Sequence, residues 1–392
     1  MATRKLDDRA LNRALMARQF LLAREGRPAL DVVRHLVGLQ SQIPLNPYTA
    51  LWSRLVGFEP AEASALLAGR ETVRLSTLRG TIHLHDVDDA LLLRAFCQGV
   101  HEATPFGERV VFRRQLDGIE PRELWAVGRA LLEETPLTTA ALGKALAERF
   151  PGCDPSALST AVRYKLSLVQ VTPRGEWGRS QAPTLTTVEA WLGRRQRTPD
   201  AAAVEALVAR YLAAFGPASV QDMQSWCGVT RLGEVFERLR PRLAVFADAT
   251  TGRELFDLPD APRPDPETPA PPRFLPDYDN VLIGHENRAR VLDDEARLWL
   301  SANNNGYRPA LLVDGRVAGV WSLAKRRRKG DPAVLDVELL PHRSRPGGSR
   351  SLGSGAASAE LPARVRAEIE AEAADLLTFL APEASAAEVH LH

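Results

Sequence analysis

The sequence has few cysteines, and none of them is placed to pair locally or to form a zinc knuckle. Cys97, Cys153 and Cys227 lie more than 50 residues apart along the chain, so no C-x-x-C motif is present. This spacing excludes the disulfide scaffold that is typical of small secreted domains. We therefore expect buried thiols in a reducing compartment.

The sequence also lacks an apolar segment that would direct it into a membrane or out of the cell. Four of the residues from Met1 to Asp8 are charged, and we expect no secretory signal here because an apolar core is lacking. No run of about 18 apolar residues occurs, so we expect no membrane span. Phosphate-binding loops of the G-x-x-x-x-G-K type and G-x-S-x-G nucleophile elbows are absent as well.

Lysine is scarce, although cations as a whole are not. The 392 residues include 50 basic and 49 acidic side chains, for a net charge of +1. Only five of the basic residues are lysine: Lys5, Lys144, Lys165, Lys325 and Lys329. A near-neutral total neither favours nor excludes nucleic acid, because binding needs only a local basic patch. The chain is long enough for roughly two to four structural units.

Two segments of the chain resemble each other and form an internal repeat. Residues 135–177 and 215–256 each predict a helix, a short turn, a second helix and a β-hairpin. This order is typical of winged-helix domains, in which the hairpin forms the wing. The N-terminal helices and a strand over residues 78–84 are interpreted as a third, more divergent copy.

These patterns predict an α+β fold with tandem winged-helix motifs and a C-terminal β-rich domain. Residues 259–272 hold seven prolines, which is typical of an extended linker. The predicted division is an N-terminal helical and winged-helix unit at 1–130, winged-helix units at 131–198 and 199–258, a linker at 259–273, and the β-rich domain at 274–392.

A polar break interrupts an apolar run at Gln40-Ser41-Gln42. A helix from Pro28 is expected to carry Gln40 on its apolar stripe, and both amides are expected to be buried. An unpartnered buried amide costs about 1–3 kcal/mol. The two glutamines therefore either cap the carbonyls at a helix end or hold a ligand or a water, beside an extended loop around Asn46.

The chemistry of two amides limits what such a site can do. Glutamine is neither a strong acid nor a strong base near neutral pH, so it suits a reaction whose leaving group is already activated. An N7-alkylated purine in DNA meets that condition, because its positive charge weakens the glycosidic bond. The protein then needs only to position a water and to stabilise a cationic sugar.

Five adjacent cations, residues 325–329, lie beside a predicted hairpin. They are Lys325, Arg326, Arg327, Arg328 and Lys329. Asp314-Gly315 predicts the turn of the preceding hairpin, and residues 334–340 are expected to form the last strand. The basic run is either a solvated hairpin tip or a phosphate or minor-groove contact. Together with the winged-helix units, it favours DNA.

A second polar constellation, residues 79–85, contains Arg79, Thr81, His83 and His85. On a strand, His83 and His85 point the same way and could share a metal ion. No companion H-x-x-x-H pair occurs, so a structural or DNA-contacting role is favoured over metal binding. Arg79 and Thr81 are expected to line the same site as the glutamines.

The residues from Leu36 to Leu55, with those from Leu78 to Leu84, resemble the AlkZ-type DNA glycosylases. The resemblance extends to residues 275–282 and 285–288, and so covers most of the chain. It implies tandem winged helices in a C-shaped scaffold, a basic DNA-inserting hairpin and a catalytic Gln-x-Gln motif. Family members often have His-Ala-Asp-Arg where this chain has His-Glu-Asn-Arg, and a Gly/Ser-rich stretch at 346–358 resembles an insertion.

The resemblance implies a monofunctional DNA glycosylase that removes N7-alkylated purines, including bulky adducts or interstrand crosslinks. The Gln-x-Gln form is associated with self-resistance to DNA-alkylating natural products. Gln40 and Gln42 would be catalytic, without metal or cofactor. The expected pocket or DNA contacts are Asn46, Arg79, Thr81, His83, Lys325, Arg326, Arg327, Arg328 and Lys329. The partner would be double-stranded DNA carrying alkylated purines, met by a monomer in the cytoplasm at the nucleoid.

Two other functions fit parts of the sequence. A non-catalytic winged-helix regulator would give a sequence-specific footprint and no base release. A hydrolase that uses His83 and His85 with a metal is the weaker option. Because winged helices serve both binding and catalysis, the fold alone does not choose among them. Whether a bulky base leaves the helical stack is also left open.

Overall fold

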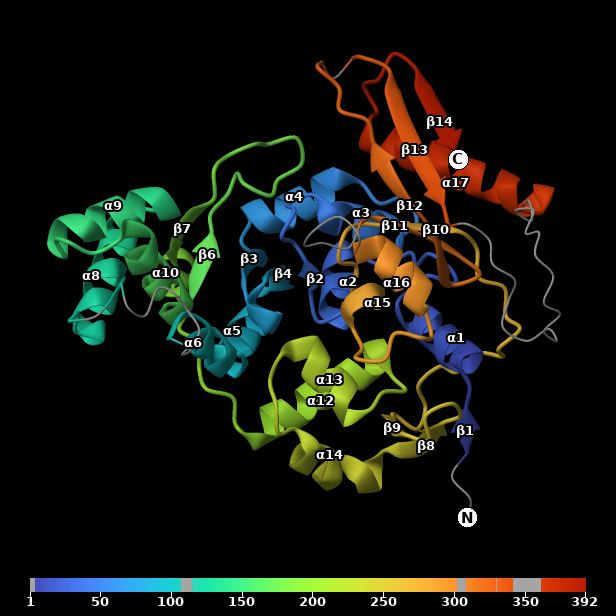
Figure 1. Ribbon diagram of the computed structural model, residues 1–392, viewed down its shortest axis with the longest axis horizontal. Helices are drawn as coiled ribbons and strands as arrows, with labels where there is room; N and C mark the ends of the chain where they lie inside the picture. Colours follow the sequence, from blue (N-terminus) through green and yellow to red (C-terminus); the bar gives the residue numbers. More distant parts are fainter. Residues whose placement is uncertain (1–3, 107–114, 117, 302–307, 329, 341–360) are drawn as a thin grey trace.

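The computed structural model describes residues 4–106, 115–116, 118–301, 308–328, 330–340 and 361–392. Lys329 and the Gly/Ser-rich stretch at 346–358 lie outside these residues. The chain forms an α+β fold in which one order of elements occurs three times (Figure 1). Each time, a helix is followed by a short strand or bridge, two helices and two strands. We call these repeats units one, two and three.

Units one and two contain six elements each. Those of unit one are α2 (Ala29–His35), β2 (Leu39–Gln40), α3 (Asn46–Trp52), α4 (Pro60–Ala68), β3 (Thr72–Ser76) and β4 (Ile82–Asp86). Those of unit two are α8 (Pro121–Glu134), β5 (Leu137–Thr138), α9 (Thr139–Arg149), α10 (Pro155–Lys165), β6 (Leu168–Gln170) and β7 (Thr184–Thr187). Helix α8 therefore spans residue 130, where the sequence placed a boundary.

Unit three follows the same order, with an isolated bridge between Ala218 and Phe256 in place of the first strand. Its elements are α12 (Ala201–Phe215), α13 (Val220–Cys227), α14 (Gly233–Leu239), β8 (Ala244–Asp248) and β9 (Glu254–Asp257). The N-terminal strand β1 (Lys5–Leu6) adds to β8 in parallel. The remaining elements before residue 243 are α1 (Asp8–Arg18), η1 (Leu78–Gly80), α5 (Val87–Phe96), α6 (Gln98–Phe106), α11 (Val188–Leu192) and η2 (Arg240–Arg242).

Units one and two share a single six-stranded sheet, in the order β2-β4-β3-β6-β7-β5. The join is the antiparallel pair of β3 and β6, where Arg74 lies opposite Gln170 and Leu75 opposite Val169. Strands β2 and β5, the first strands of their units, therefore form the two outer edges. Polar caps start the helices of unit two, because Thr138 and Asp154 accept the backbone N–H groups of Ala141 and Ala157.

The C-terminal part forms a five-stranded sheet, in the order β10-β11-β12-β13-β14. The strands are β10 (Arg273–Leu275), β11 (Ala310–Val313), β12 (Arg316–Leu323), β13 (Ala333–Leu339) and β14 (Ala387–Leu391), with helices α15 (Asn280–Ile283), α16 (Asp294–Ser301) and α17 (Ala363–Leu380). The Asp314-Gly315 turn joins β11 to β12 as predicted. Strand β14, which the sequence analysis missed, pairs in parallel with β13.

The predicted helix through Gln40 is wrong, because α2 ends at His35 and Gln40 lies in strand β2. Val37 and Gly38 have φ angles of 55° and 101°, which no right-handed helix contains. The apolar spacing continues past the helix end because both the helix and β2 face the core. The expected strand over 78–84 also begins later, at Ile82, after the η1 turn.

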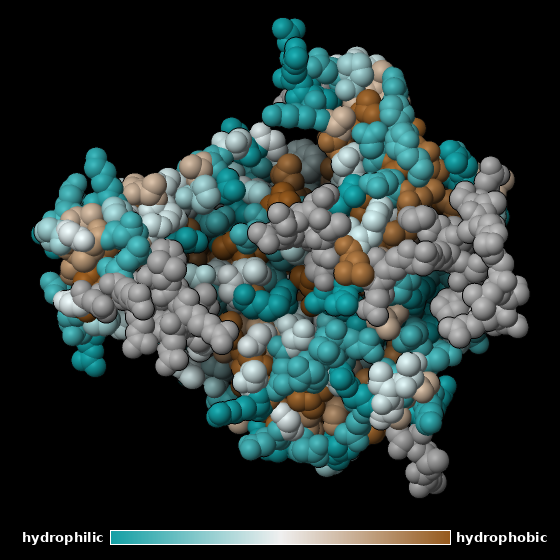
Figure 2. Space-filling model, in the orientation of Figure 1, coloured by the Kyte–Doolittle hydropathy of each residue, from teal (hydrophilic) through white to brown (hydrophobic). Residues whose placement is uncertain are grey.

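The expected linker packs against helix α1. Arg18 Nε donates to the carbonyl of Pro262 at 3.1 Å, and Arg13 Nε donates to that of Thr268 at 2.6 Å. Figure 2 shows hydrophilic side chains over most of the visible face, with hydrophobic ones in small separate groups. Within the described ranges, no helix has the length and apolar composition needed to cross a membrane.

Candidate functional site

The two glutamines lie where strand β2 leaves the edge of the six-stranded sheet. Gln40 pairs with His83 across β2 and β4 and is 7% exposed, whereas Gln42 is exposed. The expectation that both amides are buried is therefore wrong for Gln42. Gln40 is the last residue of β2. Gln42 lies two residues further along, where the chain has left the sheet, so its side chain reaches solvent.

Short contacts hold the two glutamines together. The Gln42 backbone N–H donates to Gln40 Oε1 at 3.2 Å, and the Ile82 N–H donates to Gln42 Oε1 at 3.2 Å. Both amide oxygens therefore accept a backbone N–H, which fixes the direction of each side chain. Neither Nε2 donates to another residue in the part of the chain that the structure describes. Two N–H₂ groups are thus available to a water or to a sugar oxygen.

The buried side chain of Arg74 binds Ser41, the residue between the two glutamines. Arg74 Nε donates to Ser41 Oγ and its Nη2 donates to the Ser41 carbonyl, both at 2.8 Å. Burial lowers the pKa of Arg74 to about 10, and Arg174 acts in the same direction. The guanidinium is still charged at neutral pH. The sequence analysis missed Arg74, although a lone arginine in the apolar strand Thr72–Ser76 is a signal for such a role.

The backbone just before Gln40 fits closely against a histidine. A Cβ atom on Gly38 would lie 2.1 Å from Nδ1 of His85, so only glycine fits there. The Gly38 carbonyl accepts from Asn280 Nδ2 at 3.0 Å, which ties β2 to helix α15. His85 Nε2 lies 2.8 Å from Thr77 Oγ1. These contacts determine the position of strand β2, and hence that of Gln40.

Asn46 begins helix α3 and connects it to the C-terminal part of the chain. Its Nδ2 donates to the Asp277 carbonyl at 2.8 Å, so Asn46 is 5% exposed and structurally engaged. The nearby pair of Arg54 and Asp279 is fully buried and bidentate, at 2.9 and 2.7 Å. Burial raises the pKa of the Asp277 carboxyl. Asp277 therefore brings a desolvated acid to the loop beside α3, which the sequence analysis did not single out.

The other predicted contacts on residues 79–83 are only partly accessible. Arg79 Nη1 donates to the Trp226 carbonyl of unit three, and Thr81 Oγ1 donates to the Leu78 carbonyl at 3.1 Å. His83 is 1% exposed, and its Nδ1 lies 3.0 Å from the Thr81 carbonyl. His83 therefore supports Gln40 from the neighbouring strand and offers no exposed face to DNA.

The two histidines of β4 are stacked and neutral. Their ring centroids lie 5.5 Å apart. Burial lowers the pKa of His85 to about 3 and that of His83 well below its usual value. Within the described residues, no third metal-ligating side chain joins them. The pair fits a packed support for β2.

The basic run lies far from the glutamines. Its described residues, 325–328, lie in the connection between β12 and β13, at the end of the C-terminal sheet that points away from β2 and β4 (Figure 1). Lys325, Arg327 and Arg328 are exposed, and Arg326 is half-buried. The Arg328 backbone N–H donates to Asp331 at 2.9 Å, which shapes the turn. The structure therefore brings Gln40, Gln42, Thr81 and His83 together and places the cations elsewhere.

Residues 285–288, which carried part of the resemblance, hold unit three to the C-terminal part. His285 Nε2 lies 2.9 Å from the Phe215 carbonyl. The backbone N–H groups of Glu286 and Asn287 donate to Asp222 at 3.0 and 3.3 Å. Glu286 pairs with Arg253 at 2.6 Å. The contacts of His285, Glu286 and Asn287 with Phe215, Asp222 and Arg253 therefore join this segment to unit three.

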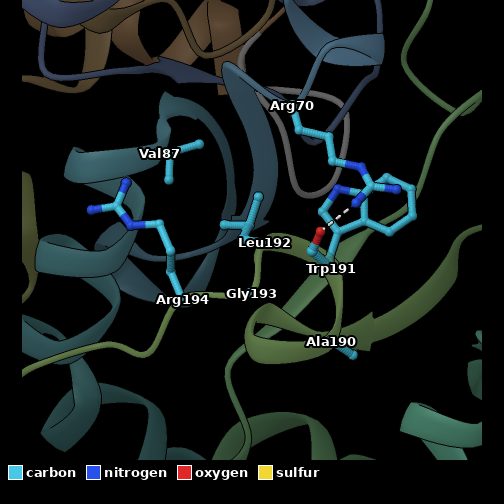
Figure 3. A pocket seen from close by; sticks show the side chains of 7 residues that line it. All are labelled: Arg70, Val87, Ala190, Trp191, Leu192, Gly193 and Arg194. Carbon is cyan, nitrogen blue, oxygen red and sulfur yellow. Dashed lines mark hydrogen bonds between the residues drawn. The ribbon is translucent and has the colours of Figure 1, made fainter.

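A hollow of about 430 Å³ lies between units one and two, away from the glutamines. Figure 3 shows Arg70 stacked on the ring of Trp191, with Arg194 on the opposite side. The Arg70 Cζ lies 3.9 Å from the ring centroid, and Arg194 pairs with Asp88 at 2.6 Å. Both cations contact other side chains of the protein, so the hollow has the features of an internal packing boundary.

The whole fold matches that of a DNA-processing enzyme. The solved structure of Streptomyces sahachiroi DNA glycosylase AlkZ superposes with a TM-score of 0.73, over 99% of this chain and 100% of that one, at 21% sequence identity. The α+β arrangement of three repeated units and a C-terminal sheet is thus a known glycosylase fold.

Sequence comparison identifies the family. The profile of the DNA glycosylase AlkZ-like family matches residues 33–379, and the chain belongs to this family. An interstrand DNA cross-link repair glycosylase of Streptomyces sahachiroi is 26% identical over 375 residues, which is 89% of this chain and 96% of that protein. The resemblance noted in the sequence is therefore confirmed, and the protein is a DNA glycosylase.

Proposed function

We propose that Gln40 and Gln42 are the catalytic residues and that the substrate is an N7-alkylated purine in double-stranded DNA. The observation that carries the proposal is the pair of amides at the β2 edge, whose oxygens are held by backbone N–H groups. Their Nε2 groups are directed by this arrangement and have no partner among the described residues. Groups fixed in this way need no reorganisation when the reaction occurs.

The proposed reaction is hydrolysis at C1′ of the modified nucleotide. The bond from C1′ to N9 breaks, and its electron pair passes to the base, which neutralises the positive charge. Water adds to C1′, and its proton passes to solvent. Because the alkylated base leaves without being protonated, amides that position the water and the sugar suffice. No metal or cofactor enters this scheme.

The exposed loop after Gln42 supports a bulky substrate. Ile43 and Leu45 are 43% and 41% exposed, and they flank Pro44 directly beside the site. Exposed apolar side chains suit contact with the flat face of an aromatic adduct better than contact with water. The relative from Streptomyces sahachiroi is named for cross-link repair, so we extend the substrate range to bulky adducts and interstrand crosslinks. The biological role would be self-resistance to a DNA-alkylating natural product.

The larger DNA contact is proposed from the repeated units. The order of elements in the units is the one expected of winged helices: a helix, a strand, two helices and two strands. The first strand lies beside the last. We infer that the three units form a C-shaped scaffold around the duplex and that the protein acts as a monomer at the nucleoid. The exposed cations Lys325, Arg327 and Arg328 would bind phosphates or a groove.

The test is base release from three duplexes, carrying N7-methylguanine, a bulky N7 adduct or an N7 crosslink. Wild type, Gln40→Ala, Gln42→Ala and the double variant are compared under single-turnover conditions. We expect each single variant to be about 10²–10³-fold slower, as for other preorganised donors. The control Gln221→Ala removes an exposed glutamine of helix α13 and should leave release unchanged.

Three results would contradict the proposal. Unchanged release by the double variant would exclude the glutamines as catalytic residues. Absence of release from every duplex, together with a sequence-specific footprint, would instead favour a winged-helix regulator. A loss of release in Gln221→Ala as large as in the site variants would show that the effect is not local.

A further inference from the structure

The last strand of the C-terminal sheet carries two histidines on one face. His390 and His392 are two residues apart, so their side chains point to the same side of β14. Val389 and Leu391, which alternate with them, pack on the other side against the core under helix α17. His392 stays in the ladder, because its N–H donates to the Val337 carbonyl at 2.9 Å. The histidines are therefore held on the outer face of the sheet.

A carboxylate on the neighbouring strand meets both rings. Asp336 of β13 lies directly opposite His390 in the parallel register. His390 Nδ1 lies 3.3 Å from Asp336 Oδ1, and His392 Nε2 lies 3.7 Å from the same oxygen. One ligand atom from each of the three residues lies within 4.8 Å of the other two. Three side chains of two metal-binding types, imidazole and carboxylate, thus converge on one point.

These separations match those between ligands of one small ion. At zinc-to-ligand distances of about 2.0–2.1 Å, two ligands of a tetrahedral site are roughly 3.3–3.4 Å apart. The His390–Asp336 separation of 3.3 Å already has this value, and the His392–Asp336 separation of 3.7 Å differs by a small rotation. The ligand atoms therefore need little movement to receive an ion.

Nε2 of His390, the ring nitrogen that does not contact Asp336, lies near a carboxylate, as the second nitrogen of a metal-binding histidine usually does. His390 Nε2 lies 3.5 Å from Glu388 Oε2, on the side of the ring away from Asp336. A carboxylate behind the second ring nitrogen fixes the tautomer and orients the ring toward the metal. This contact is independent of the cluster itself, and it favours a built site over a chance meeting of charges.

We propose that Asp336, His390 and His392 bind one divalent metal ion of the zinc class. Two imidazoles and one carboxylate favour Zn²⁺ over Mg²⁺ or Ca²⁺, which prefer oxygen ligands alone. Three protein ligands leave one position to water. The ion joins the edge strand β14 to β13, which follows directly from the basic tip. Metal binding therefore stabilises the sheet that holds this tip, and the site is separate from the glutamines.

The experiment titrates zinc chloride into the full chain after dialysis against a chelator, with calorimetry and thermal unfolding as readouts. We expect one equivalent of zinc to bind and the unfolding temperature to rise. Asp336→Asn and the pair His390→Ala/His392→Ala should weaken binding by more than about tenfold, and Glu388→Gln by about tenfold. The four side chains are 42–64% exposed, so these variants are expected to fold.

Glu370→Gln is the matched control, because Glu370 lies on helix α17 and pairs with Arg366 at 2.9 Å. It should bind zinc as the wild type does. The proposal is overturned if zinc does not bind, or if Asp336→Asn binds as tightly as wild type, which would mean chelation by the histidines alone. An equal loss in Glu370→Gln would also overturn it. Base release is not measured, so failure here leaves the proposed function untouched.

Discussion

The two outer edges of the six-stranded sheet occupy equivalent places in the repeat but present different chemistry. β2 and β5 each follow a helix, and each pairs with the last strand of its own unit. At β5, Thr138 ends the strand and accepts the Ala141 N–H at 3.2 Å, which caps helix α9. At β2, Gln40 ends the strand, and the next helix begins only at Asn46.

The difference lies in the connection between strand and helix. In unit two the chain enters α9 directly, so the polar residue at the end of the strand accepts a free backbone N–H at the start of the helix. In unit one, residues 41–45 intervene, and the polar side chains are released from capping. Arg74 and Gly38 hold this connection in place from the inside. Under the proposed function, a repeated unit acquires its reactive site because one of its connections is lengthened and anchored.

The largest effect should come from removing the space that β2 needs. In Gly38→Ala, the new Cβ would meet His85 Nδ1 at 2.1 Å, at a φ of 101°. Conformational strain and overpacking together should cost about 3 kcal/mol, and β2 should shift with loss of base release. The control is Gly193→Ala at the end of helix α11, where φ is 64° and no described atom lies within 4 Å of the added Cβ. Denaturant unfolding should show a smaller loss for the control, and equal losses would contradict the role of His85.

The next effect should come from releasing Ser41. In Arg74→Met, two charged donors are lost from the Ser41 carbonyl and hydroxyl, while a buried charge is also removed. We expect about 2 kcal/mol of destabilisation and a roughly 10²-fold slower release, because misplacement of a site by about 1 Å has that effect. Arg70→Met, which removes an exposed arginine stacked on Trp191, should leave the rate unchanged. A normal rate in Arg74→Met would show that the loop keeps its position without this anchor.

Local signals in the sequence predicted much of this arrangement. The helices of the repeat in residues 135–177 and 215–256 were visible because helix caps and apolar periods occur within short windows. The hairpin expected within residues 135–177 is wrong, because β6 pairs with β7, which begins only at Thr184. The Asp314-Gly315 turn was confirmed because its signal is contained in two residues. The Gln-x-Gln pair stood out as polar residues in an apolar run. Its catalytic role stays a prediction.

Features that depend on distant residues were not predictable. The end of α2 depends on Val37 at a φ of 55°, which is disfavoured for a β-branched residue and is maintained by packing of β2 against β4. Strand β14 pairs with β13 across helix α17 and a long connection, so no local period indicates it. The exposure of Gln42 likewise follows from the sheet edge, which the sequence alone does not define.

Acidification should affect the β2 edge before the β5 edge. Burial lowers the pKa of His85 to about 3 and that of His101 to about 4, whereas unfolded histidine titrates near about 6.5. The unfolded state therefore binds protons first, and stability falls as the pH drops below about 6.5, by up to about 1.4 kcal/mol per pH unit for each histidine.

Residues 121–193 contain no histidine, so unit two provides the internal reference for this effect. Hydrogen exchange between about pH 6.5 and 5, corrected for intrinsic rates, should lose protection in β4 before β7. Parallel loss in both strands would contradict a histidine origin and would favour carboxylates spread over the whole protein.

The smallest expected loss of stability comes from a comparison of Thr138, which caps a helix, with Gln40, which we propose to be catalytic. Thr138→Ala removes the hydroxyl that accepts the Ala141 N–H, which should cost about 1 kcal/mol of stability with no change in base release. Gln40→Ala removes an acceptor of a single loop N–H, so it should cost less stability and most of the rate. When both variants are measured by thermal unfolding and single-turnover release, Thr138→Ala should lose mainly stability and Gln40→Ala should lose mainly rate. If Gln40→Ala lost stability and rate in the proportion seen for Thr138→Ala, the glutamine would be a structural cap like its counterpart, and the two edges would differ only in length.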